Sequence, residues 1–262
     1  TLNAGASNTG MNAGAYGTVQ IGKFTVTGNY SFNHNDSPRS YSESGREDYT
    51  STDYRYLESN ASSKYKSNFQ FGSMEGSYEI DTLNLVTFSM QMWGGSNKGT
   101  GDGNTRMLND RREHTYSYNT LNRTKSRFGS IAANFDYQHS FKKKGEYLTF
   151  SYRYNGSPTG SETYTEYEDV KDYPYDMDYL RNQYFDNDAR TDEHTFQVDY
   201  SNPISDMHDI AVGAKYILRD NQSKTDYYKE FDGTYQPDEN LTDRYEQTQN
   251  IMAAYADYKL RW

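Results

Sequence analysis

The sequence has 262 residues, with 27 Lys and Arg against 37 Asp and Glu and a formal net charge of -10. Only 33% of the residues are hydrophobic, below the roughly 45–50% of an ordinary soluble domain, yet 16% are aromatic, a class that disordered chains lack. Cysteine is absent, which excludes disulfides, thiolate metal sites and cysteine nucleophiles, and the acidic balance argues against a nucleic-acid partner. A polar chain rich in aromatic residues indicates a sheet with one apolar and one wet face.

Alternation of apolar and polar residues with a period of two is the main signal along the chain. It is clear from Phe24 to Phe32, from Leu148 to Tyr154 and from Ile210 to Leu218. It predicts nine antiparallel strands, which in chain order are 12–20, 24–35, 62–80, 84–96, 122–141, 147–157, 190–202, 208–222 and 245–262.

The predicted connections alternate in length. Short turns are expected at 21–23, 81–83, 142–146 and 203–207, and long loops at 36–61, 97–121, 158–189 and 223–244. Tight turns at one end and large loops at the other are typical of an outer-membrane barrel, whose strands cross with only about 9–11 residues each. The sequence therefore predicts an all-β fold, an antiparallel up-and-down transmembrane β-barrel that forms a single domain over residues 1–262.

Each strand then has one face toward lipid and one toward the lumen. The residues predicted to face lipid are Phe150, Tyr152, Val198, Val212, Ala214 and Tyr216. Those predicted to face the lumen are Arg153, Asp199, Lys215, Arg219, Asp257 and Lys259. Aromatic residues near strand ends are expected to form girdles at the membrane interfaces, although aromatics are common in any strand. They are Trp93, Tyr147, Tyr200 and Trp262.

The acidic segment 158–189 is the richest candidate for ligand contact. Six tyrosines within this predicted loop are expected to touch a ligand: Tyr164, Tyr167, Tyr173, Tyr175, Tyr179 and Tyr184. Its aspartates at 176, 178, 186 and 188 have the oxygen chemistry of a cation site, but a solvated charged loop is the favoured interpretation. No metal and no cofactor are predicted.

Catalytic motifs are weak throughout. The run GTVQIGKF at 17–24 matches the start of a phosphate-binding loop, but Phe24 stands where a Ser or Thr is needed and a strand follows. The five histidines are scattered without metal-ligand spacing, and no GxSxG elbow occurs. The sequence therefore predicts a protein that is not an enzyme.

The last third of the chain carries a recognisable pattern, FQVDYSNPISDMHDIAVGAKYILRDNQS followed by QTQNIMAAYADY. It resembles the outer-membrane β-barrel family related to TonB-dependent receptors. That resemblance implies a barrel of about 22 strands with an N-terminal plug and an energy-coupling box. Neither the plug nor the box is visible, and nine strands are too few, so we expect a fragment of about half a barrel. Tyr258, Leu260 and Trp262 mimic the aromatic signal that ends many outer-membrane proteins.

These observations predict part of a receptor or transporter in the bacterial outer membrane that takes up a nutrient ligand through its loops and lumen. The expected partners are outer-membrane lipid, an energy-coupling periplasmic protein engaged through the missing N-terminal region, and a small-molecule, glycan or peptide ligand. Two alternatives stay open. One is a surface or adhesion barrel that transports nothing, and the other is a soluble all-β carbohydrate-binding protein.

Overall fold

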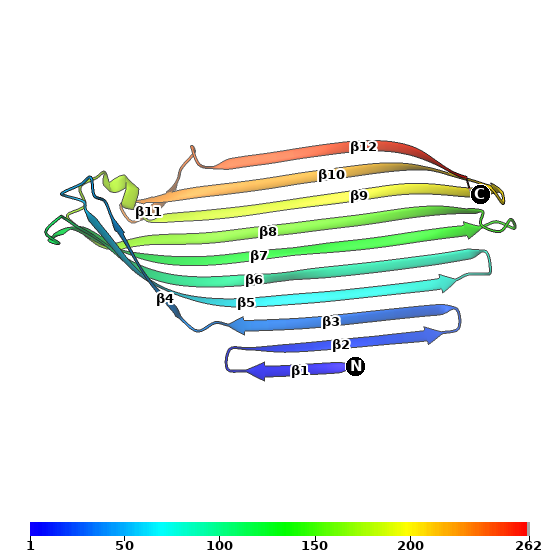
Figure 1. The fold of residues 1–262 in the computed structure, drawn as a ribbon, viewed down its shortest axis with the longest axis horizontal. Coiled ribbons are helices and arrows are strands. Elements are labelled where there is room, and N and C mark those ends of the chain that lie inside the picture. Colours follow the sequence, from blue (N-terminus) through cyan, green and yellow to red (C-terminus); the bar gives the residue numbers. More distant parts are fainter. Residues whose placement is uncertain (261–262) are drawn as a thin grey trace.

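The fold is one antiparallel sheet of 12 strands with a short 3-10 helix, seen in a computed structural model that describes residues 1–260 (Figure 1). The elements are β1 (Leu2–Ser7), β2 (Gly10–Ile21), β3 (Phe24–Asp36), β4 (Ser40–Glu47), β5 (Tyr56–Glu79), β6 (Asn84–Leu108), β7 (His114–Ser140), β8 (Tyr147–Lys171), η1 (Met177–Leu180), β9 (Gln183–Ser205), β10 (His208–Phe231), β11 (Thr234–Pro237) and β12 (Asp243–Leu260).

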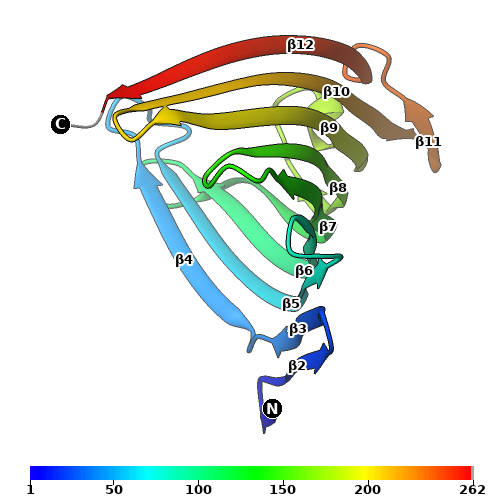
Figure 2. The same cartoon turned by 90° about the vertical axis from the view of Figure 1, so that its right-hand side faces the viewer.

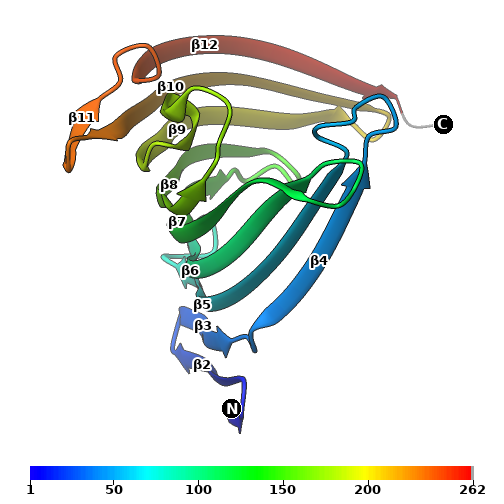
Figure 3. The same cartoon turned by 90° about the vertical axis from the view of Figure 1, so that its left-hand side faces the viewer.

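Neighbours in the sheet follow the order of the chain, which confirms the up-and-down prediction. On one side of β5, β3 and β4 pair with different parts of the strand. In the same way, β11 and β12 pair with different parts of one side of β10. The sheet curls along its width but stays open, with β1 and β12 at its two sides (Figures 2 and 3). It is a barrel wall rather than a closed barrel.

All nine predicted strands are present, but most run further than the sequence indicates. The predicted long loops at 97–121, 158–189 and 223–244 are largely strand, and the loop at 36–61 contains β4. β1 and β11 are strands that the sequence pattern missed. The reason is that both faces meet water beyond the bilayer, so apolar alternation ends there while backbone hydrogen bonds continue the ladder.

The short turns are confirmed at one end of the sheet, called here the turn end, at 22–23, 80–83, 141–146 and 206–207. The last of them is shorter than predicted, because β9 continues through Pro203 to Ser205 and a register shift follows at His208. The opposite end, called the loop end, carries 48–55, 109–113, 172–182 and 238–242. Among the described residues, no helix has the length and apolar character needed to cross a membrane.

The strand register separates the two predicted sets of side chains. Phe150 pairs with Val198, which pairs with Ala214, so these lie on one side, called here the apolar face. All six residues predicted to face lipid occupy this face. All six predicted to face the lumen, including Lys215 and Asp257, lie on the opposite side, called the polar face.

The large apolar side chains are the exposed ones. Phe135 is 43% exposed, Phe150 42% and Val198 43%, all on the apolar face. Within the part of the chain that the structure describes, the buried hydrophobic residues are Met107, Leu108, Tyr116 and Leu180. A soluble sheet would bury its apolar face in a core, whereas lipid replaces that core for a membrane barrel. This pattern removes the soluble alternative.

The apolar band is short compared with the strands. On β8 it runs from Leu148 to Tyr154, and beyond it the same face carries Gly156 and Pro158. The remainder of β8, from Asn155 to Lys171, extends about 55 Å further at roughly 3.3 Å per residue. The apolar band therefore lies near the turn end, and the strands run far beyond it toward the loop end.

The girdle prediction needs correction. Tyr200 lies on the apolar face, where it pairs with Val212. Trp93 and Tyr147 lie on the polar face, because each is adjacent in its strand to an apolar-face residue and successive side chains point to opposite sides. Those two assignments are therefore wrong. Trp262 lies outside the described residues.

Candidate functional site

A group of six tyrosines gathers on the polar face at the loop end. Its members, called here the tyrosine cluster, are Tyr54, Tyr116, Tyr118, Tyr167, Tyr173 and Tyr175. The ring of Tyr116 meets that of Tyr173 edge-on at 5.4 Å between centroids, and Tyr173 meets Tyr175 at 5.5 Å. Such tilted and edge-to-face arrangements are those that aromatic rings prefer.

Strands and loops both contribute to this cluster. Tyr116 and Tyr118 stand on β7 and Tyr167 on β8, while Tyr54 and Tyr175 come from the 48–55 and 172–182 loops. The loops therefore fold back over the polar face at the mouth of the wall (Figure 3). Burial raises the pKa of Tyr116 and of Tyr167, so their hydroxyl groups stay protonated at neutral pH.

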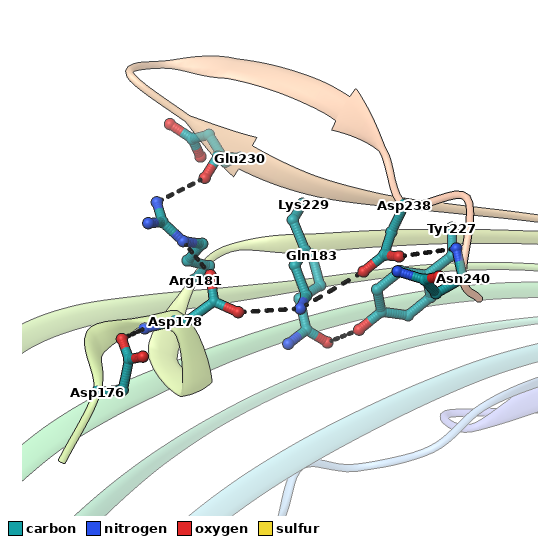
Figure 4. A network of polar contacts seen from close by, with 9 residues as sticks. All are labelled: Asp176, Asp178, Arg181, Gln183, Tyr227, Lys229, Glu230, Asp238 and Asn240. Carbon is teal, nitrogen blue, oxygen red and sulfur yellow. Dashed lines mark hydrogen bonds and ion pairs between the residues drawn. The ribbon is translucent and has the colours of Figure 1, made fainter. Parts of the chain in front are cut away.

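A network of charged groups ties the 172–182 loop to the end of β10 (Figure 4). Arg181 donates from Nε to Oδ1 of Asp178 at 2.6 Å, and Lys229 Nζ lies 3.2 Å from Oδ2 of the same carboxylate. The Lys229 ammonium also lies 3.5 Å from Asp238, and the Arg181 guanidinium lies 4.1 Å from the ring centroid of Phe231. The hydrogen bond from Arg181 holds the pKa of Asp178 below its usual value. This network fixes the loop that carries Tyr173 and Tyr175.

The aspartates considered for a cation are engaged or dispersed. The carboxylate of Asp176 accepts from the backbone N–H of Asp178 at 2.9 Å, at the start of η1. Asp178 belongs to the network above, and Asp188 forms an ion pair with Arg127. Asp186 and Asp188 lie on β9, on the same side of the sheet as the apolar band.

The six tyrosines predicted to bind a ligand divide into three groups. Tyr167, Tyr173 and Tyr175 join the cluster. Tyr164 and Tyr184 stack on each other at 4.3 Å on the opposite face of the sheet. Tyr179 stands on η1 and is 70% exposed.

Two corrections follow from these positions. Tyr164, Tyr167 and Tyr184 belong to strands rather than to the predicted loop. Sequence reasoning also missed Tyr54, Tyr116 and Tyr118, because strand pairing from β5 to β8 brings them to the predicted residues from distant parts of the chain.

The polar face below the cluster is lined with hydrogen-bonded groups. Arg219 donates from Nε and Nη2 to Oε2 of Glu193 at 2.8 and 2.6 Å. Arg153 donates to the side-chain oxygen of Asn134 at 2.8 Å. The Tyr255 hydroxyl donates to Asp199. A wall of this kind suits a water-filled lumen.

Residues 139–262 match the model of a family described as an outer membrane protein beta-barrel family. The match places the chain in the bacterial outer membrane. It covers β8 to β12, which include the segments that carry the family pattern in the sequence. Neither the curated proteins nor the solved structures include a match to the chain. The fold and the family match together support an outer-membrane barrel.

Proposed function

We propose that the chain forms part of the wall of an outer-membrane receptor of the TonB-dependent type, which takes up a nutrient ligand. The tyrosine cluster is the observation that carries this proposal. It places ring faces and neutral hydroxyl groups at the loop end of the polar face, where a ligand from outside would arrive first. Aromatic rings with a polar tip are common in binding surfaces because they combine apolar contact with hydrogen bonding.

The long strands agree with a role in capture. Tyr167 lies 13 residues past Tyr154 on β8, so the strand holds this part of the cluster about 43 Å beyond the apolar band, measured along the strand at roughly 3.3 Å per residue. The Asp178 network then fixes the 172–182 loop over the mouth, which reduces the entropy lost when a ligand binds. The role of these residues is binding and passage rather than catalysis.

Uptake against a gradient needs energy, and the outer membrane must receive it from elsewhere in the cell. In this proposal a periplasmic energy-coupling partner supplies it through a part of the protein outside these residues. Dependence on that partner distinguishes transport from adhesion. A surface barrel used only for adhesion would bind its target in cells depleted of energy, whereas uptake would stop.

The experiment compares nutrient accumulation by cells that carry the full-length protein and its variants. Replacing Tyr173 and Tyr175 together by alanine removes two rings of the cluster from the loop and should abolish uptake. Tyr179→Ala is the matched control, since that residue stands on η1 in the same loop and its ring, 70% exposed, is not one of the packed rings of the cluster. Surface protein is quantified by labelling of whole cells. Unchanged uptake in the double variant at equal surface level contradicts the role of the cluster, and uptake that survives a protonophore contradicts energy coupling.

A further inference from the structure

Three aromatic residues on neighbouring strands form a second aromatic surface on the polar face, between the turn end and the tyrosine cluster. They are Phe69 on β5, Trp93 on β6 and Phe128 on β7, called here the aromatic shelf. The rings of Phe69 and Trp93 stack at 6.5 Å between centroids, and Trp93 meets Phe128 at 6.2 Å. Phe69 is 40% exposed and Trp93 41%, so the shelf is open to a ligand.

The register explains how three bulky rings fit side by side. Phe69 pairs with Gly95, which pairs with Phe128, so a residue without a side chain separates the two rings across β6. A Cβ atom at Gly95 would lie 3.1 Å from the Phe128 ring and 2.2 Å from the carbonyl oxygen of Asn68. Gly95 thus leaves the space in which Phe128 approaches Trp93.

The surroundings of the shelf carry no charged side chain at the neighbouring polar-face positions. Phe71, the cross-strand partner of Trp93, lies on the same face, and the polar neighbours on β5 to β8 are all uncharged: Ser67, Ser73, Gln91, Asn97, Ser126, Ser130, Ser157 and Thr159. This is notable in a chain of which 24% is charged. The shelf therefore offers ring faces together with hydroxyl and amide groups, and no charge that would attract or orient an ionic ligand.

We propose that the aromatic shelf is a stacking subsite for a neutral oligosaccharide on its way through the barrel. A pyranose ring presents a face of C–H groups that packs on an aromatic ring, and hydroxyl groups at its edge that exchange hydrogen bonds with Ser, Asn and Gln. A ligand with carboxylate or phosphate groups would lose hydration beside these neutral side chains without gaining an ionic partner. The inference rests on the proposed transport function, since it takes the polar face as the ligand path, and it narrows the ligand to one class.

Trp93 makes the proposal measurable in the purified full-length protein in detergent. The probes are the neutral hexasaccharides maltohexaose, cellohexaose, mannohexaose and xylohexaose, with hexagalacturonate as the charged comparison. We expect at least one neutral probe to bind and change the tryptophan emission, and that change to be absent in Trp93→Phe. Calorimetry should show affinity about tenfold weaker in Trp93→Ala but within about threefold in Trp93→Phe, because a phenyl ring preserves stacking. Met92→Ala, at the next residue on the opposite face, is the matched control and should bind like the parent protein.

Binding of no neutral probe, preference for hexagalacturonate, or unchanged affinity in Trp93→Ala overturns the subsite. Growth assays separate this result from the transport proposal. If the shelf binds a neutral probe but cells without the protein grow on that sugar as well as the parent strain, transport fails and the subsite stands. If cells need the protein for a peptide or metal chelate and Trp93→Ala has no effect, transport stands and the subsite fails.

Discussion

Arginine in place of Ala214 tests which face of the wall meets lipid. Ala214 lies at the middle of the apolar stretch of β10 from Ile210 to Leu218, and it pairs with Val198 on one side and Ala254 on the other. A guanidinium there would enter the hydrocarbon with apolar neighbours. Arginine near the midplane of a barrel costs about 2–4 kcal/mol, so the free energy of unfolding should fall by that amount.

Ala211 provides a matched control on the same strand. It lies on the polar face, where it pairs with Ser201 and Asp257. Arginine there would reach water and a carboxylate, so Ala211→Arg should change stability by less than about 1 kcal/mol. The assay is urea titration of the full-length protein folded into lipid vesicles, with each variant compared with the parent protein. Equal losses for the two variants, or no loss for Ala214→Arg, would mean that the faces are assigned wrongly.

Three further outcomes follow from individual contacts. Gly213→Ala should destabilise the barrel by about 1–3 kcal/mol, because the new Cβ would lie 2.3 Å from the ring of Tyr255. The loss of stability should be smaller in a Tyr255→Ala background, and an equal loss in both backgrounds refutes the contact. Asp178→Asn should expose loop 172–182 to protease at pH 7. In the parent protein the hydrogen bond from Arg181 lowers the pKa of the Asp178 carboxylate below 3.8, its value in the unfolded chain. Protection from protease should therefore persist at any pH above 3.8 and be lost only as the pH falls through the lower pKa of the folded protein. Loss of protection near neutral pH contradicts this. Tyr116→Ala removes a residue that is only 8% exposed and should speed amide hydrogen exchange in the same loop. Tyr116→Phe keeps the ring and should leave the exchange rate unchanged. Equal exchange rates in the two variants count against the cluster.

The sequence predicts the membrane-crossing part of this fold well, because lipid on one side and water on the other impose alternation. From Ile210 to Leu218 that alternation separates two sets of side chains, and the register keeps the two sets on opposite sides of the sheet across five strands. Beyond the bilayer the constraint ends. Residues 158–171 carry Gly, Pro and acidic residues and resemble a loop, yet backbone pairing with β7 and β9 holds them in β8.

The candidate site was predictable only in part, for a different physical reason. Tyr173 and Tyr175 stand out because their loop is rich in tyrosine. Tyr54 and Tyr116 have no such local signal, and they join the cluster only through the pairing of β5 with β6 and β6 with β7. Trp93 is also misassigned from the sequence. Its place near the end of the predicted strand 84–96 indicates a membrane girdle, whereas the register places it on the polar face in the middle of β6.

The free side of β12 has a consequence for how the protein enters the membrane. Over its 18 residues this strand pairs with β10 alone among the described strands, and its other side offers unpaired N–H and C=O groups. Each such group left without a partner in hydrocarbon costs several kcal/mol. Lipid therefore favours the state of the wall in which the free side of β12 is paired, so insertion and the closing of this seam are energetically linked.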